Sequence, residues 1–418
     1  MRVVVVGGGV IGLTTAYELA RNGVEVVVVD ARATGLGASA VNAGWFVPAE
    51  ATPVPGPGMV AQTLRWMLRR DSPVYLRPTL DPQFVAFLLT MWRRCNARDQ
   101  RAGFEAHLQL AADTAEALDA YRADGIGFEM HTNGLLMVFT RAENLQHHLG
   151  NLDLVRRFDL DPRVLVGDEV RTHEPLLSEH VHSGIFFPHE RHLDPRALVQ
   201  GLHARLLELG VKILEHTPVT GVRTADHRGR RRVTAVATDA GPVDGDVFVL
   251  AAGAWTGRLS ALFGHRLPVR PGKGYSIDVP ALPLGGATNL SDAKVALTPY
   301  GNRLRLAGTM EFAGLDERVN DVRVRAILRA PAAYLRDWEP PTGPLRPKAG
   351  MRPMTPDGLP VIGLLPSTEN TYVTSGHGML GVTLAAGSAR ALADLVVQGM
   401  PPPQLAPFDP ARFSHPPR

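Results

Sequence analysis

Several residue types are scarce in this sequence of 418 residues, and each scarcity excludes a class of protein. The chain has one cysteine, Cys95, which rules out an intramolecular disulfide and a zinc site built from cysteines. A chain without disulfides is expected in a reducing cytoplasm. Only four of the 44 basic residues are lysine, and a net charge of +3 is too dilute for a nucleic-acid-binding surface.

Long hydrophobic runs are also missing. Residues 3–17 are uncharged, but glycines interrupt them, and this stretch is too short to span a bilayer. No small-residue cleavage site follows before Glu18 and Arg21, which argues against a secretory leader. We interpret the stretch as part of the folded protein. The length predicts about two domains or one large α/β domain.

The first motif lies in that N-terminal stretch. Residues 3–6 are four valines, typical of a parallel strand buried on both faces. Residues 7–12, Gly-Gly-Gly-Val-Ile-Gly, match G-x-G-x-x-G, and a helix is expected from there to the Asn22-Gly23 pair. A second strand, residues 25–29, ends at Asp30. This strand–turn–helix–strand context predicts a dinucleotide site.

Each residue type in the motif has a physical role. Gly7 permits the tight turn, Gly9 lets the backbone approach a pyrophosphate, and Gly12 allows the helix to pack closely on the strand. The helix N-terminus presents unpaired N–H groups and its positive dipole end to the phosphates. Asp30 can accept hydrogen bonds from ribose hydroxyls, and its charge argues against a 2′-phosphate and therefore against NADP.

The following segment favours a flavin. Residues 34–44 are small and polar and show neither helical nor strand periodicity. A loop of this kind can extend along a long ligand such as FAD, whereas a simple NAD domain would continue into another strand–helix unit. On composition alone, an ordinary surface loop explains the segment equally well.

Two short helices are expected in the segment that follows. Residues 64–70 and 84–94 are amphipathic and basic, and they carry Trp66 and Trp92. Helices with these properties can lie on an anionic membrane surface. They can also cover an active site with their arginines in solvent. A longer helix is expected over residues 104–122.

Histidines are dense between residues 126 and 192, which raises the question of a metal site. Their spacing is irregular, and no H-x-x-x-H pattern lies on a predicted helix. We therefore predict no metal. The histidines concerned are His131, His147, His148, His173, His180, His182, His189 and His192.

The chain returns to the nucleotide-binding sheet after residue 190. The last strand of this part, within residues 245–250, ends in a small-residue turn, residues 251–255, that can approach a cofactor because it lacks bulk. The dinucleotide domain is therefore expected to be discontinuous. Earlier strands of the same sheet are expected at residues 211–214, 217–222 and 233–237.

A second excursion is expected from Pro268, and the chain returns at residues 350–363. A C-terminal helix should then run to about Gln398. The tail after Met400 is proline-rich and is expected to be loose.

Four blocks of sequence together resemble the D-amino-acid oxidase/glycine oxidase superfamily of FAD enzymes, most closely its bacterial D-amino acid dehydrogenase branch. The blocks occur in the family's order along nearly the whole chain. They are the N-terminal glycine motif, Ser39-Ala40-Val41-Asn42-Ala43-Gly44, Lys273-Gly274-Tyr275-Ser276, and the pair at residues 350–363 and 376–388.

This resemblance implies an α/β (α+β) fold with two domains and the flavin between them. The FAD-binding domain would be a discontinuous Rossmann-like unit formed by residues 1–78, 190–265 and 345–418. The substrate domain would be built on a mixed, largely antiparallel sheet from residues 79–189 and 266–344.

The resemblance also implies a set of site residues. Arg352 matches the arginine that binds the substrate carboxylate, and Tyr275, His377 and Gly44 are expected beside the substrate. Residues expected to bind FAD are Val6, Gly7, Gly9, Val10, Ile11, Gly12, Asp30, Ala31, Arg32, Ser39, Asn42, Ala43, Gly44, Val219, Ala251, Ala252, Gly253, Trp255, Gly350, Arg352, Gly376, His377, Gly378, Met379, Leu380, Gly381 and Thr383.

Two departures from related enzymes bear on the chemistry. Covalent sarcosine oxidases attach flavin through a cysteine near the block at 350–363, where this chain has Met351 and Met354, so we predict non-covalent FAD. Glycine oxidase has a second arginine where this chain has Met379. That change suits a somewhat larger or apolar substrate.

Three functional hypotheses follow. The first is oxidative deamination of D-amino acids by hydride transfer to the flavin, with electrons passed to a quinone or another acceptor. The second is oxidation of cyclic or N-methylated amino acids, of the D-proline, hydroxyproline or sarcosine type, or of glycine. The third is FAD binding without turnover. The expected location is cytoplasmic, with peripheral contact to the inner face of the plasma membrane if the basic helices bind lipid; the sequence does not fix the oligomeric state.

Overall fold

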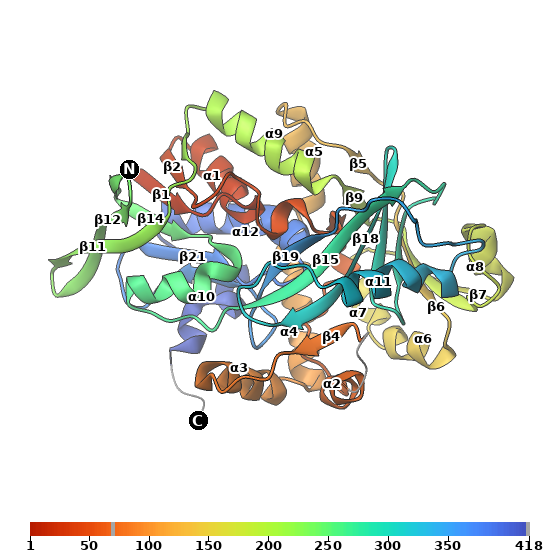
Figure 1. Cartoon of the computed structure of the whole chain (residues 1–418). Helices are drawn as coiled ribbons and strands as arrows, with labels where there is room; N and C mark the ends of the chain where they lie inside the picture. The colour runs from red at the N-terminus through yellow and green to blue at the C-terminus, as the bar shows by residue number, and fades with distance from the viewer. Residues whose placement is uncertain (68–71, 415–418) are drawn as a thin grey trace.

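The computed structural model describes residues 1–67 and 72–414 and contains two large β-sheets (Figure 1). A six-stranded sheet has the order β10-β2-β1-β14-β21-β20. All neighbours in it are parallel except β20 and β21. Its strands are β1 (Arg2–Val6), β2 (Glu25–Val29), β10 (Lys212–Leu214), β14 (Val247–Leu250), β20 (Val361–Leu364) and β21 (Thr371–Ser375).

Valine-rich strands form this sheet because both of its faces are covered. Val4 in β1 and Val28 in β2 are fully buried. Helices α1 (Val10–Arg21), α9 (Pro195–Glu208) and α12 (Gly381–Gln398) share a hydrophobic core with one face of the sheet.

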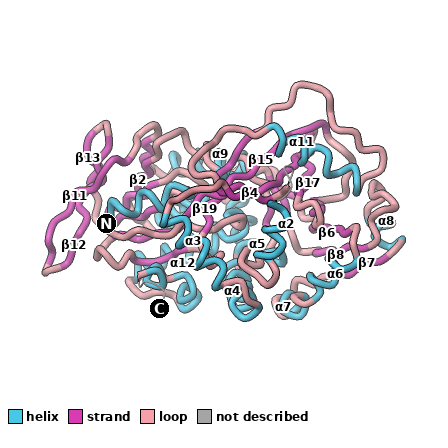
Figure 2. The backbone as a smooth tube through the Cα atoms, turned by 60° about the horizontal axis from the view of Figure 1, so that its bottom comes forward, coloured by secondary structure: helices cyan, strands magenta, loops and turns pink. Residues whose placement is uncertain are grey.

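A separate antiparallel sheet covers the other face. It consists of β11 (Val219–His227), β12 (Arg230–Thr238) and β13 (Gly241–Asp244), which project from one end of the molecule in Figure 2. The expectation that strands at 217–222 and 233–237 extend the nucleotide-binding sheet is wrong. A tight turn with positive φ at Arg228 and Gly229 folds β11 back on β12, so the two pair with each other.

The second large sheet is mixed and mainly antiparallel. Its order is β19-β15-β18-β17-β16-β6-β8-β7, and β4 pairs with β18. Figure 1 shows it at the opposite end from β11 and β12. Its strands are β4 (Val74–Leu76), β6 (Leu135–Phe139), β7 (Arg163–Val166), β8 (Ser183–Phe187), β15 (Arg270–Pro280), β16 (Ala287–Leu290), β17 (Val295–Tyr300), β18 (Arg303–Phe312) and β19 (Lys348–Met354).

The two sheets divide the chain much as the predicted boundaries do. All strands of the six-stranded sheet lie within segments 1–78, 190–265 and 345–418. Two strands of the nine-stranded sheet, β4 and β19, also come from these segments. The boundaries themselves stay a prediction. A small sheet of β3 (Trp45–Phe46), β9 (Arg191–Leu193) and β5 (Met130–His131) lies where the chain passes between the two parts.

The predicted long helix over residues 104–122 is two helices, α4 (Ala97–Ala111) and α5 (Thr114–Ala123). Asp113 stands at the N-cap position of α5, where aspartate is favoured. The remaining α-helices are α2 (Met59–Met67), α3 (Pro82–Arg93), α6 (Ala142–Leu149), α7 (Leu152–Arg156), α8 (Asp168–His173), α10 (Thr256–Leu259) and α11 (Asp321–Arg329).

The basic helix predicted at 64–70 is seen in part. Helix α2 covers its first residues, and residues 68–70 lie outside the described part of the chain. The helix predicted at 84–94 corresponds to α3. Within residues 1–67 and 72–414, no helix combines the length and the apolar character needed to cross a membrane.

The C-terminal tail is not loose, at least to residue 414. Two short 3₁₀ helices, residues 403–408 and 410–413, bury Leu405 and Phe408 against the core. Arg412 pairs with Asp357 at 2.8 Å. Composition alone misled the prediction, because prolines that disfavour regular helix are compatible with short 3₁₀ turns.

Candidate active site

A cavity of about 1620 Å³ runs between the two large sheets. It is lined both by the β1–α1 turn and by Arg352 of β19. Every residue predicted to bind cofactor or substrate lines this cavity except Gly12, Gly376 and Thr383. The roles assigned to these residues stay predictions, but the fold brings them to one place.

The β1–α1 turn is built by its glycines. Gly7 has a φ of +120°, and a Cβ there would lie 2.4 Å from the carbonyl oxygen of Ala251. A Cβ at Gly12 would lie 1.9 Å from the carbonyl oxygen of Gly7, which explains why Gly12 packs behind the cavity wall. The first N–H groups of α1 have no partner within the helix and carry its positive dipole end. The turn is therefore a cradle for an anionic group such as a pyrophosphate.

Asp30 closes this end of the cavity. Its carboxylate accepts hydrogen bonds from the N–H of Gly8 at 2.6 Å and of Arg32 at 2.8 Å. Each oxygen keeps a second lone pair that can accept from a ribose hydroxyl. The Arg32 guanidinium lies 4.7 Å from the ring centre of Trp255, so charged and aromatic surfaces meet beside the predicted adenosine position.

The loop of residues 38–44 runs along the middle of the cavity. The Ser39 hydroxyl accepts a hydrogen bond from the N–H of Val10 at 2.9 Å, which joins the loop to the start of α1. The Asn42 side chain accepts from the N–H of Gly44 at 2.7 Å and donates back to Ala38 and Ser39. Gly44 has a φ of +71°, and a Cβ there would lie 2.0 Å from the carbonyl oxygen of Leu193.

An ion pair between a buried arginine and a partly exposed aspartate, which sequence analysis missed, binds this loop to the other sheet. Arg305 of β18, 3% exposed, pairs with Asp278 of β15 at 2.7 Å and donates to the carbonyl oxygen of Asn42 at 3.0 Å. The Tyr300 hydroxyl donates to the carbonyl oxygen of Ala43 at 2.6 Å. An arginine between leucines in a strand was a signal of this role, but its partner depends on strand register.

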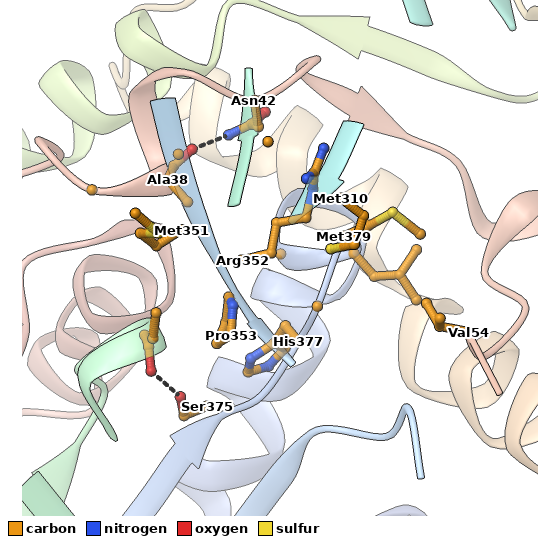
Figure 3. A pocket seen from close by; sticks show the side chains of 18 of the residues that line it. Ala38, Asn42, Val54, Met310, Met351, Arg352, Pro353, Ser375, His377 and Met379 are labelled. Atoms are coloured by element: carbon orange, nitrogen blue, oxygen red, sulfur yellow. Dashed lines mark hydrogen bonds between the residues drawn. The ribbon is translucent and has the colours of Figure 1, made fainter. Parts of the chain in front are cut away.

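Arg352 enters the cavity from β19, with Met310 and Met379 beside it in Figure 3. Its Nη1 donates to the carbonyl oxygen of Thr309 at 2.7 Å, and burial lowers its pKa to about 10. No carboxylate pairs with it among the residues that the structure describes. The guanidinium fits against β15 only because residue 274 is glycine: a Cβ there would lie 2.0 Å from Nη1.

The chain after β21 contributes His377. This side chain is 2% exposed, and its Nε2 is 3.0 Å from the Ser388 hydroxyl. Burial, with a smaller contribution from His107, lowers its pKa to about 3, so the imidazole is neutral. Gly376 has a φ of +81°, and Thr383 hydrogen-bonds to Trp45 and Val47.

Tyr275 lies at the cavity wall but its hydroxyl is already engaged. It donates to Glu311 at 2.9 Å, in a buried cluster with Lys273 and Arg323. Desolvation raises the pKa of Tyr275. Its predicted contact with the substrate carboxylate stays a prediction, and in this conformation the hydroxyl is used within the protein.

Helices α2 and α3 form an apolar rim on the cavity. Leu64, Leu89 and Trp92 all line it, yet they are 60%, 49% and 60% exposed. Figure 1 shows α2 and α3 together at one side of the molecule. We refer to these three residues as the apolar rim.

These features define a class of protein. The site combines a glycine turn at a helix N-terminus, an acid on the next strand and a long cavity that ends at an arginine without an acidic partner among the described residues. This combination is typical of a dinucleotide-dependent enzyme with an anionic substrate. Among the described residues, no three His, Cys, Asp or Glu side chains group as they would around a metal ion.

Comparison with known proteins gives the family. Residues 2–395 match the model of the DAO family, FAD dependent oxidoreductase. The chain belongs to this family, is an FAD-dependent oxidoreductase, and uses FAD as its cofactor. It is 34% identical to a D-amino acid dehydrogenase of Bradyrhizobium diazoefficiens over 99% of both chains. It is 35% identical to one of Cereibacter sphaeroides over 100% of this chain and 97% of the relative.

Solved structures share the fold at lower identity. Glycine oxidase from Geobacillus kaustophilus superposes with a TM-score of 0.78, at 24% identity over 99% of both chains. L-proline dehydrogenase from P. horikoshii gives 0.76, at 20% identity over 99% of this chain and 97% of that one. At these identities the likeness establishes the two-sheet fold alone.

Proposed function

We propose that this enzyme oxidises D-amino acids to 2-oxo acids and ammonia and passes the electrons to a quinone. The observation that carries the proposal is Arg352, a cation in the cavity with no acidic partner among the described residues. A substrate carboxylate would supply the missing anion in a bidentate, charge-assisted pair. Relatives named D-amino acid dehydrogenases at 33–35% identity support the choice of substrate.

The residues present fit FAD. The glycine turn, Asp30 and the loop of residues 38–44 follow one another along a cavity of about 1620 Å³, and side chains at Gly7 or Gly44 would collide with the backbone. When bound, FAD supplies the hydride acceptor, and the protein supplies position and field.

Arg352 contributes to the reaction by positioning the substrate. A fork of two hydrogen bonds fixes the carboxylate in one plane and thereby fixes the direction of the Cα–H bond. Met310 and Met379 lie beside it in Figure 3, and their apolar side chains lower the local polarity, which strengthens the pair. The 2-imino acid formed on oxidation then hydrolyses to the 2-oxo acid and ammonia.

The test is an anaerobic absorbance titration of the purified flavoprotein. Bleaching of the flavin band by D-alanine, and not by L-alanine, is expected. Bleaching only by D-proline, hydroxyproline or sarcosine would assign the enzyme to cyclic or N-methylated substrates instead. A flavin that no amine bleaches would refute the proposal. Slow recolouring in air, and fast recolouring with a short-chain quinone, are expected for a dehydrogenase.

The apolar rim supports the quinone as acceptor and a membrane as its source. Exposed leucine and tryptophan beside a catalytic cavity are suited to the acyl boundary of a bilayer, and Arg65 and Arg93 on the same helices are exposed toward anionic headgroups. An acceptor dissolved in lipid could reach the cavity without crossing water.

Co-sedimentation with vesicles tests this contact. The protein should pellet with phosphatidylglycerol vesicles at low salt and less at high salt. The double variant Leu89→Ser/Trp92→Ser should stay in the supernatant yet still be bleached by D-alanine. Equal pelleting of this variant and wild type would rule out the rim as the contact.

A further inference from the structure

Removing hydride from an amino acid requires a neutral amine, so the site must allow the substrate's ammonium group to lose a proton. An aliphatic ammonium keeps its proton at neutral pH. The lone pair on nitrogen can support loss of hydride from Cα only after that proton has left. A group that accepts the proton must therefore be water or a side chain near Arg352, and the sequence alone singled out none.

The cavity offers three carboxylates among the described residues: Asp30, Glu50 and Glu317. Glu317 pairs with Arg32 at 3.0 Å, and Asp30 binds the backbone of the same residue, so both stand at the adenosine end. Glu50 stands elsewhere. It also lines a second, small cavity together with Val54 and Met379.

Val54 and Met379 locate Glu50 at the substrate end. Figure 3 shows Met379 beside Arg352 and Val54 just beyond it. The carboxylate shares the small cavity with these two side chains, and it lines the main cavity together with Arg352.

Strand register relates the backbone positions to which Arg352 and Glu50 are bound. The Arg352 guanidinium binds β18 at Thr309, and the Asn289 amide, which donates to Glu50 Oε2 at 2.7 Å, belongs to β16. Strand β17 lies between β18 and β16, which separates these two strands by ~10 Å, and the residue of β18 in line with Asn289 is Ala307, two residues or ~7 Å along the strand from Thr309. The two backbone positions are therefore ~12 Å apart. A bound α-amino acid, with a hydrogen bond of about 2.8 Å at each end and three angled covalent bonds of about 1.5 Å between a carboxylate oxygen and the nitrogen, spans up to ~9 Å, which is of the same order.

Small side chains leave the space between them open. Ala307 of β18 faces Ala296 of β17, which faces Asn289 of β16, and all three line the cavity. A guanidinium at one end of this floor and a carboxylate at the other match the carboxylate and ammonium of a zwitterion.

From this placement we infer that Glu50 binds the substrate's α-ammonium group and takes its proton. One N–H bond of the ammonium breaks, an O–H bond forms on Glu50, and the amine is left neutral for loss of hydride from Cα. Water can then accept the proton from Glu50 between turnovers. This inference rests on the proposed oxidation of amino acids.

The surroundings of Glu50 suit a group that exchanges protons. Desolvation raises its pKa to about 7, against the hydrogen bond from Asn289 and the charge of Lys294. The charged and titratable groups that face it are Lys294, from the turn before β17, and Glu190, from the turn before β9, while His377 lines the same small cavity.

The two oxygens of Glu50 are held differently. Oε1 is buried without a hydrogen-bond partner among the described residues, as is Nδ1 of His377. Both residues line the small cavity of about 20 Å³, which has room for one water molecule. Oε2, bound by Asn289, keeps a second lone pair and is the oxygen left for the substrate.

The test compares pH profiles of kcat/KM for D-alanine in wild type and in Glu50→Gln, which keeps the shape and the hydrogen-bond acceptor. At pH 7 the variant should lose about 10²-fold, as expected for general-base catalysis. At pH 10, where the substrate amine is already neutral in solution, it should approach wild type. Loss of the same factor at every pH would overturn the inference.

A binding measurement separates this role from a structural one. Propanoate has the carboxylate without the amine, so its Kd, read from the shift of the flavin spectrum, should be equal in wild type and Glu50→Gln. Weaker propanoate binding in the variant would show that Glu50 shapes the pocket instead, and would also overturn the inference.

Glu190→Gln provides the matched control. Glu190 is 1% exposed, accepts a hydrogen bond from the N–H of Ala49 at 2.8 Å, and does not line the main cavity. Its variant should keep the wild-type profile. If no D-amino acid bleaches the wild-type flavin, the proposed function itself fails; if bleaching occurs but the profiles coincide, only the assignment of Glu50 fails.

Discussion

Replacing Arg352 should separate substrate binding from cofactor binding. In Arg352→Met the side chain keeps much of its length and loses its charge and both arms of the guanidinium. Hydrogen bonds to charged groups contribute about 1.5–3 kcal/mol each. Loss of the carboxylate fork should therefore cost about 3 kcal/mol or more, which is a factor of about 10² in kcat/KM for D-alanine.

The structure predicts that Arg352→Met will lose activity without losing thermal stability. Arg352 donates to one carbonyl oxygen, that of Thr309, and pairs with no carboxylate among the described residues. Its pKa is lowered by burial, which shows that the folded protein disfavours the charge. Without substrate, Arg352→Met should thus unfold at the same temperature as wild type or higher.

A second variant reaches the same result without touching the arginine. In Gly274→Ala a Cβ would lie 2.0 Å from Nη1 of Arg352, so the guanidinium must move. The matched control is Gly127→Ala, where no atom lies within 4 Å of the new Cβ. Steady-state kinetics, the flavin-to-protein absorbance ratio and Tm are the assays. Wild-type kcat/KM in Arg352→Met would refute the binding mode, and loss of FAD would show that Arg352 holds the cofactor instead.

Five further outcomes are expected. Gly12→Ala should purify with little FAD, measured by the flavin-to-protein absorbance ratio, because its Cβ would lie 1.9 Å from the Gly7 carbonyl oxygen. Asp30→Ala should weaken FAD retention, measured by dilution, without changing substrate preference. Arg305→Met leaves Asp278, which is 33% exposed, with Arg303 at 3.5 Å as its remaining partner, and should lower the free energy of unfolding by about 2 kcal/mol, measured in urea. Phe408→Ala should cost ~3 kcal/mol, because the ring is fully buried; an unchanged urea midpoint would contradict the docked tail. His107 and His377 have folded pKa values lowered to about 4 and about 3, so the unfolded chain binds more protons below pH 6.5. The stabilisation that these two neutral side chains contribute should be fully present above pH 6.5 and should be lost as the pH falls toward 3. The plot of Tm against pH should therefore be less steep in this range for His107→Gln than for wild type.

Local chemistry explains what could be predicted from sequence. Strand β1, the glycine turn and helix α1 follow one another directly, so their roles depend on neighbours within a few residues. The C-terminal helix was predicted for the same reason: its apolar face is continuous, and Gly399, with a φ of +76°, ends it. Such elements can be read in order along the chain.

The features that could not be predicted depend on pairing between strands that are distant in the sequence. Arg305 and Asp278 meet because β15 and β18 pair in one register, and a shift of one residue would put the two side chains on opposite faces. Strands β11 and β12 give a second example. Their valines suggest buried parallel strands, but the turn at Arg228 makes the two strands pair as a hairpin. Sequence patterns carry little information on register.

Arg352 and Glu50 show the limit most clearly. An arginine in a motif is recognisable, but its lack of an acidic partner becomes visible only when every neighbour has been placed. Glu50 is bound by Asn289, 239 residues away, and nothing in its local sequence distinguishes it from a surface carboxylate. Folding thus brings together groups that are far apart in the sequence: an arginine without an acidic partner among the described residues and, across the cavity floor, a buried carboxylate. Together they match the two charges of a zwitterionic substrate.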